Sequence, residues 1–324
     1  MTTPFLIEEA VREQIPLVML LMGVSGAGKT YTALAVASYM LDQNGPQPWM
    51  KDQIVVIDSD NGRSSRYASG KPFYFSMLRM TKFDPDTWCD AYAYAVGKGF
   101  KYIIIDSSSD EWQWILEESE RMAKGERNKE RIWGVLTPKH NRFLRTITNG
   151  AANVIVTALM KPHYETVEKD GKKQKVRQGN APIQRDGVER LFDIAGVIEE
   201  GATIRFIKTL CSALAEQYID KPGRDLALTI KAWLKEGEPH VPSSIAEMAD
   251  VLAPKLAMCT SPQEAEPLYN QLDVWCQKRN LAFDQAKRPL RIAAAELLKK
   301  QRAGADQSDA PPTPRPTQQS ATNV

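Results

Sequence analysis

The sequence predicts a doubly wound α/β fold: a mostly parallel sheet flanked by helices, followed by a small C-terminal helical unit. Short runs of apolar residues without polar alternation recur through the first two thirds of the chain, as is typical of strands buried on both faces of a parallel sheet. Stretches with helical spacing separate these runs, which is the rhythm of successive βα units. A glycine-rich motif lies between the first apolar run and the first helical stretch.

The apolar runs and the helical stretches alternate in a regular order. Strands are expected at 17–22, 54–57, 73–75, 102–105, 153–159, 194–198 and 203–207. Helices are expected at 30–43, 85–97, 110–124 and 132–148, and the turn 199–202 should join the last two strands. We therefore expect residues 1–236 to form one α/β domain.

The C-terminal third differs in composition from this domain. Residues 237–302 are expected to form the helical unit, with a helix start marked by Ser243, Ser244 and Glu247, because a capping serine is often followed by a glutamate three residues later. Residues 303–324 are rich in proline, serine and threonine and poor in apolar residues. We expect them to form a disordered tail.

The bulk composition excludes several classes of protein. The four cysteines are far apart and form no CxxC pair, so neither a zinc site nor a disulfide framework is expected, and a reducing cytoplasm fits. The longest apolar run, 17–22, is far shorter than the roughly 20 residues that span a bilayer, and no membrane association is expected. The net charge of +2 is too small to predict a nucleic-acid partner by itself.

The glycine-rich motif carries the most specific signal in the chain. Gly23–Thr30 matches G-x-x-x-x-G-K-[ST], the P-loop, with a strand before it and a helix after it. Its glycines let consecutive backbone N–H groups face phosphates at the positive end of a helix. Lys29 should reach the β- and γ-phosphates of ATP, and Thr30 should ligate Mg²⁺. The expected nucleotide-binding residues are Gly23, Val24, Ser25, Gly26, Ala27, Gly28, Lys29, Thr30 and Tyr31.

An acidic residue ends the expected strand 102–105. Asp106 follows directly after it, and the carboxyl end of a parallel strand is where ligands bind in such sheets. We expect Asp106 to hold Mg²⁺ through water, the alternative being that it only caps a turn. The next residue is Ser107, where AAA+ ATPases have a glutamate, which argues against that class. Asp110 and Glu111 are weaker candidates for a catalytic acid, since both could cap a helix.

With these motifs the chain resembles the RecA-like P-loop ATPases of bacteriophages and prophages that are associated with single-strand annealing and DNA recombination. The resemblance covers roughly residues 15–210. It implies a homo-oligomer in the cytoplasm of a bacterial host, with single-stranded DNA and a phage recombination protein as partners. These ATPases have a catalytic glutamate two residues after an aspartate that ends a strand. Here Asp60 follows Asp58 in that way, so it is implied as the catalytic acid, unless both residues serve only the turn.

Three further polar residues acquire possible roles. The strand 153–159 usually carries a γ-phosphate sensor near its end, and Thr157 and Lys161 are the nearby polar residues. Relatives have Lys-Ser-Arg after the last strand pair. This chain has Lys208-Thr209-Leu210, so an arginine is missing and Lys208 is the remaining candidate for a positive finger that acts across a subunit interface.

A charged hairpin is expected after strand 153–159. Its turn carries Asp170-Gly171, a strong hairpin signal, and five basic residues accompany that single acid: Lys169, Lys172, Lys173, Lys175 and Arg177. Such a loop could contact DNA phosphates, or it could be a solvated hairpin that only keeps the protein soluble.

The expected function is Mg²⁺-dependent binding and hydrolysis of ATP, coupled to DNA recombination, repair or annealing of the phage type. Turnover is expected to be slow, because Asp60 has a shorter side chain than glutamate. A small-molecule kinase and a non-hydrolysing nucleotide-dependent switch or assembly protein are the alternatives.

Overall fold

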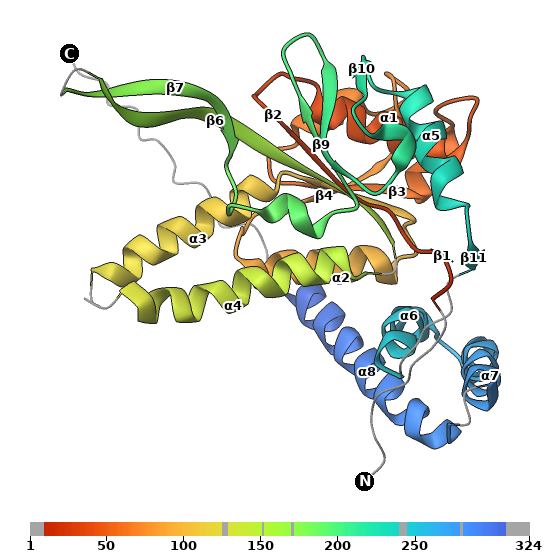
Figure 1. Ribbon diagram of the computed structural model, residues 1–324. Coiled ribbons are helices and arrows are strands. Elements are labelled where there is room, and N and C mark those ends of the chain that lie inside the picture. Colours follow the sequence, from red (N-terminus) through yellow and green to blue (C-terminus); the bar gives the residue numbers. More distant parts are fainter. Residues whose placement is uncertain are drawn as a thin grey trace, which may run out of the picture.

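A computed structural model describes residues 10–124, 129–150, 152–169, 172–239, 245–278 and 281–308. Its centre is a mixed sheet in the order β10-β9-β8-β2-β6-β5-β3-β4, with β7 paired to β6 (Figure 1). Within this order the strands from β8 to β4 run parallel to one another, whereas β9 is antiparallel to β8 and β7 is antiparallel to β6. The expected α/β fold is confirmed. The strands of this sheet are β2 (Val18–Gly23), β3 (Ile54–Asp58), β4 (Ser76–Arg79), β5 (Tyr102–Asp106), β6 (Asn153–Lys169), β7 (Lys172–Pro182), β8 (Ile194–Ile198), β9 (Thr203–Thr209) and β10 (Tyr218–Asp220).

Helices cover both faces of the sheet, because successive side chains of a strand point to opposite sides. On one face, Met19 and Leu21 of β2 join a buried cluster with α1 (Lys29–Leu41) and α5 (Arg224–Leu234). On the other face, Leu20 and Met22 pack with α2 (Pro85–Gly97) and α4 (Lys129–Thr148). The helix α3 (Ser108–Ala123) begins just after β5 and packs against α4. Figure 1 shows these layers.

The strand β6 is the element that most exceeds its expected length. It was expected at 153–159, but it runs to Lys169 and pairs antiparallel with β7 beyond the sheet. The two strands form a hairpin arm that projects from the body in Figure 1. The hairpin is confirmed, while its turn Asp170-Gly171 lies outside the described residues. The expected strand at 73–75 is wrong: β4 begins at Ser76, and Phe73 is a buried core residue just before it.

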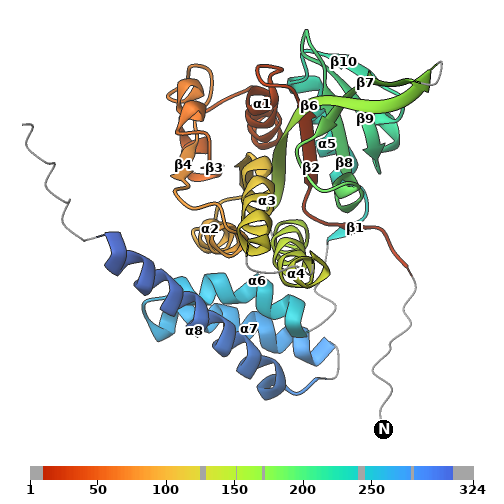
Figure 2. The ribbon, with the colours of Figure 1, turned by 90° about the vertical axis from the view of Figure 1, so that its left-hand side faces the viewer.

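Three helices form a separate layer at the C-terminal end: α6 (Ile245–Met258), α7 (Pro262–Lys278) and α8 (Phe283–Ser308). Leu252, Trp275 and Leu290 are among the residues of their own buried cluster, and Figure 2 shows the layer lying against α2 and α4. A cavity of about 780 Å³ opens between α2 and α4 on one side and α6 and α8 on the other. No residue of the P-loop lines it.

The boundaries of this unit differ in part from those expected. The helix α8 continues to Ser308, past the expected start of the tail at residue 303. The rest of that tail, like the helix start Ser243-Ser244, lies outside the described residues. The short strands β1 (Glu13–Gln14) and β11 (Glu238–Pro239) pair with each other where the two parts of the chain meet. Among the described helices, none combines the length and the apolar character that a membrane crossing requires.

Candidate functional site

The residues 23–30 form a tight loop between the end of β2 and the start of α1. Gly26 and Gly28 have φ angles of 82° and 99°, a left-handed conformation that residues with a Cβ rarely adopt. Gly23 is required for a different reason, because a Cβ there would stand 2.6 Å from the carbonyl oxygen of Ile198 on β8. The loop therefore has the shape and the close packing that the motif predicts.

Lys29 is the first residue of α1, and its side chain turns back over the loop. Its ammonium group donates hydrogen bonds to the carbonyl oxygens of Gly23 (3.0 Å) and Val24 (2.9 Å). Burial lowers the pKa of Lys29 from its ordinary 10.5, and the negative charges of Asp106 and Asp60 oppose that shift. The P-loop ammonium group and both predicted acids thus belong to one electrostatic site.

Asp106 ends β5, and its carboxylate accepts hydrogen bonds from two hydroxyl groups. Thr30 donates to its Oδ2 at 2.7 Å, and Thr157 of β6 donates to its Oδ1 at 2.6 Å. Burial raises the pKa of Asp106 above its ordinary 3.8, and the charge of Asp58 adds to that shift, whereas the two hydrogen bonds and Lys29 oppose it. The contact with Thr30 joins the P-loop to the end of β5, as the expected shared role in Mg²⁺ binding requires.

The chemistry of these groups fits Mg²⁺. The Thr30 hydroxyl and the Asp106 carboxylate are hard oxygen donors that already lie side by side, and Mg²⁺ in such sites takes few protein ligands and completes its shell with water and phosphate oxygens. Within the described ranges, no cluster of three or more histidine, cysteine, aspartate or glutamate residues would hold a metal without a nucleotide.

Asp58 anchors the turn that follows β3. Its buried carboxylate accepts hydrogen bonds from the N–H of Gly62 (2.7 Å) and from the hydroxyl group of Ser64. Asp58 is therefore used to fold residues 61–64 and faces no solvent. Asp58 therefore fits the alternative expected from the sequence, in which it serves the turn.

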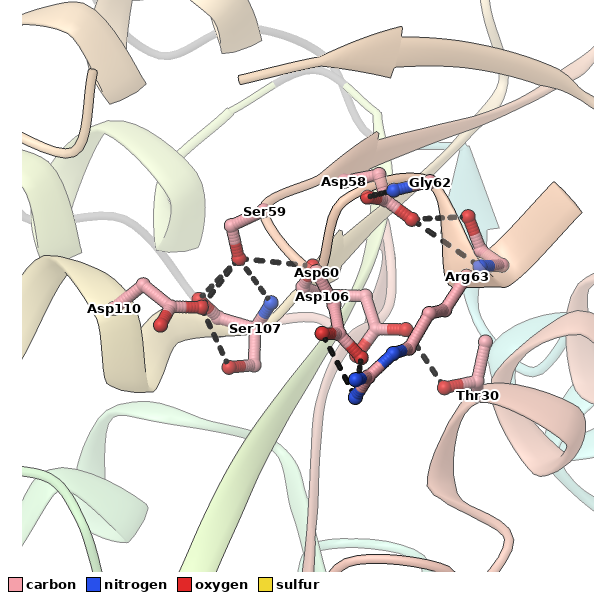
Figure 3. A network of polar contacts seen from close by, with 10 residues as sticks. Thr30, Asp58, Ser59, Asp60, Gly62, Arg63, Asp106, Ser107 and Asp110 are labelled. Atoms are coloured by element: carbon pink, nitrogen blue, oxygen red, sulfur yellow. Dashed lines mark hydrogen bonds and ion pairs between the residues drawn. The ribbon is translucent and has the colours of Figure 1, made fainter. Parts of the chain in front are cut away.

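Asp60 lies in the same turn and is accessible, with 49% of its side chain exposed. Its Oδ2 accepts a hydrogen bond from Nη1 of Arg63 at 3.4 Å, and its Oδ1 lies 3.3 Å from the same nitrogen in an ion pair, as Figure 3 shows. Arg63 begins the 3₁₀ helix η2 (Arg63–Tyr67). The predicted catalytic acid thus has a cationic neighbour, Arg63, which no sequence motif marks.

A second network joins the ends of β3 and β5. Ser59 donates to Asp110 at 2.5 Å and accepts from the N–H of Ser107 at 2.9 Å, and the Ser107 hydroxyl donates to Asp110 at 3.2 Å (Figure 3). Asp110, one of the weaker candidates, therefore ties the turn that carries Asp60 to the start of α3.

Glu111, the other weaker candidate, lies in a different environment. It is fully buried, and both of its carboxylate oxygens lie 3.0–3.1 Å from Nδ1 of His140 on α4. Burial raises the pKa of Glu111, and the hydrogen bond with His140 opposes the shift. A catalytic role in contact with substrate does not fit this position, because the carboxylate is closed off inside the α3–α4 interface.

The candidate sensors and finger take separate positions. Thr157 is fully buried and its hydroxyl is engaged with Asp106, so it contacts the site through that carboxylate. Lys161 is exposed at the base of the arm. Lys208 donates to the carbonyl oxygen of Arg190 at 2.7 Å. Because it pairs with Ala195, it lies toward the end of β8 opposite the P-loop and does not reach the nucleotide site of its own chain.

Tyr31 follows the P-loop directly and is 45% exposed. Its ring packs edge to face with Phe73 at 5.1 Å and with Tyr67 at 6.1 Å between centroids. A half-exposed aromatic ring next to a phosphate cradle offers a flat apolar surface to a nucleobase.

The basic residues of the arm follow the two strands outward. Lys175 pairs with Thr166 and Lys172 with Lys169 along the ladder. Lys175 and Arg177 are exposed, and Arg177 also donates to Asn180 at 3.2 Å. Of Lys169, Lys172 and Lys173 only the backbone is described. The arm therefore presents basic residues away from the nucleotide site, at the far end of the strand that carries Thr157.

Three residues of these networks, Ser59, Arg63 and His140, were not predicted from the sequence. Ser59 and Arg63 stand beside the acids of the expected strand end and had no motif to mark them. His140 is far from Glu111 in the sequence, and only the packing of α3 on α4 brings the two together.

Comparison with known proteins gives a family match. The family model, described as an AAA domain, matches residues 15–214, well over half of the chain. No curated protein matches the chain. One matching solved structure is that of a prototypical ATPase from the type III secretion system of pathogenic bacteria, with 14% identity, a TM-score of 0.31, and coverage of 89% of this chain and 88% of that one. The family match corrects the expectation, drawn from Ser107, that the chain is not of the AAA type.

Proposed function

This chain belongs to the AAA domain family, and from that premise we propose that it binds ATP with Mg²⁺ and hydrolyses its γ-phosphate bond. The observation that carries the proposal is the 2.7 Å contact between Thr30 of the P-loop and Asp106 of β5. It joins the two residues that must act on the same metal ion and the same phosphates.

Each group at the site can be given a separate role toward the phosphates, the metal ion or the attacking water. The backbone N–H groups of residues 23–30 and the ammonium group of Lys29 would hold the phosphates. Thr30 would ligate Mg²⁺ and Asp106 would hold it through water, and the ion would neutralise charge that develops on the phosphate oxygens. Asp60 is accessible and lies close enough for its charge to act on Lys29. It is therefore the acid best situated to orient the attacking water.

In the proposed step, the oxygen of water forms a bond to the γ-phosphorus and the bond to the bridging oxygen of ADP breaks. The proton of the water passes to Asp60, and ADP and phosphate leave. Asp60 is paired with Arg63 in this structure, so the pair has to open before Asp60 can act. This requirement, together with the short side chain of aspartate, supports slow turnover.

We further propose that single-stranded DNA binds along the β6–β7 arm and stimulates turnover, in a role in recombination or annealing. The support is geometric. The strand β6 carries Thr157, which bonds Asp106, and the same strand continues into the arm with its basic residues. A ligand bound to the arm would therefore act on a strand that contacts the carboxylate proposed to hold Mg²⁺. A homo-oligomer, with Lys208 acting on a neighbour's nucleotide, belongs to the same proposal.

The test measures Mg·ATP binding by calorimetry and phosphate release by the wild type, Lys29→Ala and Asp60→Asn, each with and without a single-stranded oligonucleotide. We expect Lys29→Ala to lose binding and Asp60→Asn to keep binding but lose turnover by about 10²-fold or more. Tight binding without phosphate release would favour a non-hydrolysing switch, and transfer of phosphate to a metabolite would favour a small-molecule kinase. Failure of the wild type to bind Mg·ATP would refute the proposal.

A further inference from the structure

Arg63 is held at the nucleotide site by the turn that follows β3. Asp58 fixes this turn by accepting from Gly62 and Ser64, and the N–H of Arg63 donates to the carbonyl oxygen of Asp60 at 3.0 Å. Gly62 has a φ angle of 77°, which permits the sharp reversal. The backbone of Arg63 is thereby fixed, while 70% of its side chain is exposed.

The partner of Arg63 lies at the same edge of the sheet as the P-loop. The guanidinium group of Arg63 contacts Asp60 through Nη1, at 3.3 and 3.4 Å from the two oxygens. The strand pairing places Asp58 beside Asp106, which accepts the Thr30 hydroxyl group, so the turn that follows β3 carries Arg63 at the edge where the P-loop begins α1. Figure 3 shows the guanidinium group paired with Asp60, together with Asp106 and Thr30.

The ion pair with Asp60 is of a kind that breaks easily. Both partners are about half exposed or more, and exposed pairs contribute little because water screens them and long side chains lose entropy. A terminal phosphate carries more charge than a carboxylate and offers three oxygens to the planar fork of an arginine. When ATP enters, the phosphate is thus the stronger partner.

We propose, on the basis of the ATPase function above, that Arg63 is a further catalytic residue that leaves Asp60 and binds the γ-phosphate of ATP. The exchange has two consequences. A cation supplied from the same chain stabilises the charge on the transferring phosphoryl group, and Asp60 loses its cationic partner and becomes available to accept the proton of water. Lys208, held at the opposite end of β8, does not supply that cation within its own chain.

The chain offers a matched control. Arg66 lies three residues further along the same 3₁₀ helix and is also exposed. Arg63→Ala, Arg63→Lys and Arg66→Ala are compared with the wild type in phosphate release and in calorimetric binding of Mg·ADP and of Mg·AMP-PNP, a non-hydrolysable ATP analogue. Thermal unfolding of each variant monitors the fold.

We expect Arg63→Ala to lower kcat by about 10²-fold and to weaken AMP-PNP binding by roughly tenfold with ADP binding unchanged, because only AMP-PNP carries a γ-phosphate. Arg63→Lys should retain part of both properties, and Arg66→Ala should match the wild type. If Arg63→Ala and Arg66→Ala give the same kcat and the same ratio of AMP-PNP to ADP affinity, the inference is wrong. An equal loss of ADP and AMP-PNP binding in Arg63→Ala would show a structural role only and would also overturn it.

These outcomes are distinct from failure of the proposed function. A wild type that releases no phosphate removes the ATPase proposal, and the two binding measurements still decide whether Arg63 contacts the γ-phosphate.

Discussion

Thr157 donates a 2.6 Å hydrogen bond to Asp106 and so joins β6 to the carboxylate that ends β5. Both residues are buried. The strand β6 also lies against β2, which leads into the P-loop. One hydroxyl group therefore links the strand that continues into the arm to the acid that we propose holds Mg²⁺, beside the strand that leads into the phosphate cradle.

Thr157→Val should weaken Mg·ATP binding and shift its pH dependence. The hydrogen bond opposes the rise in the pKa of Asp106 that burial causes, so its loss should raise that pKa further. Because Mg²⁺ needs the ionised carboxylate, affinity increases as the pH rises through this pKa, and the variant should need a higher pH. Loss of such a supporting contact typically costs about 10- to 100-fold in metal affinity.

Calorimetric titration of Mg·ATP over a pH series checks this expectation, with Thr157→Ser as the control that keeps the hydroxyl group. A Thr157→Val curve of Mg·ATP affinity against pH that overlays the wild-type curve would contradict the role given to this hydrogen bond.

The pH dependence of folding stability has the opposite sign to that of Mg·ATP binding. Because the folded state binds the proton of Asp106 more tightly than the unfolded state, this group's contribution to stability falls as the pH rises from the ordinary 3.8 through the raised pKa.

His140→Phe should destabilise the protein by about 3 kcal/mol at neutral pH, because it leaves the buried carboxyl group of Glu111 without its partner. Urea unfolding measures the change. Glu111→Leu combined with His140→Phe should recover most of the loss, since replacing both members of a buried pair is often neutral. Equal stability of His140→Phe and the wild type would mean that Glu111 finds another partner.

Gly23→Ala should cost about 1–3 kcal/mol of stability, because its Cβ would stand 2.6 Å from a backbone oxygen of β8 that cannot turn aside. Gly134→Ala is the matched control. Nothing lies within 4 Å of a Cβ at Gly134 on α4, so that change should stabilise the helix by about 0.5–1 kcal/mol. Denaturant unfolding of the two variants should give shifts of opposite sign, and a shared sign would refute the steric argument.

Lys175→Ala with Arg177→Ala should weaken binding of single-stranded DNA and reduce its salt dependence. If both side chains contact phosphates, the slope of log affinity against log salt should fall by about 1.4 in magnitude. Fluorescence anisotropy of a labelled oligonucleotide at several salt concentrations measures this slope. The control is Lys231→Ala on α5 with Lys235→Ala at the C-cap of that helix, which lies far from the arm (Figure 1). Equal slopes for the two double variants would exclude the arm as the DNA surface.

The P-loop and most of the strands were predictable because their signals are local. Gly26, Gly28 and Lys29 belong to one short motif, and runs such as 102–105 are apolar throughout because helices cover both faces of the sheet. The misplaced strand at 73–75 has a physical cause. Phe73 is buried against α1 beside Tyr31 rather than in the sheet, and an apolar run does not distinguish these two forms of burial.

The sequence by itself determined that this chain has a phosphate cradle and an acid at the end of a buried strand, since each depends on a few consecutive residues. Only the tertiary structure decided that Thr157 bonds Asp106, that Arg63 pairs with Asp60, and that His140 closes over Glu111. Thr157 and Asp106, like His140 and Glu111, are distant in sequence and meet only after the strands and helices have packed, so no local pattern records these contacts. Arg63 and Asp60 are three residues apart, but their pairing depends on the course of the turn after β3, which Asp58 fixes from the buried end of that strand.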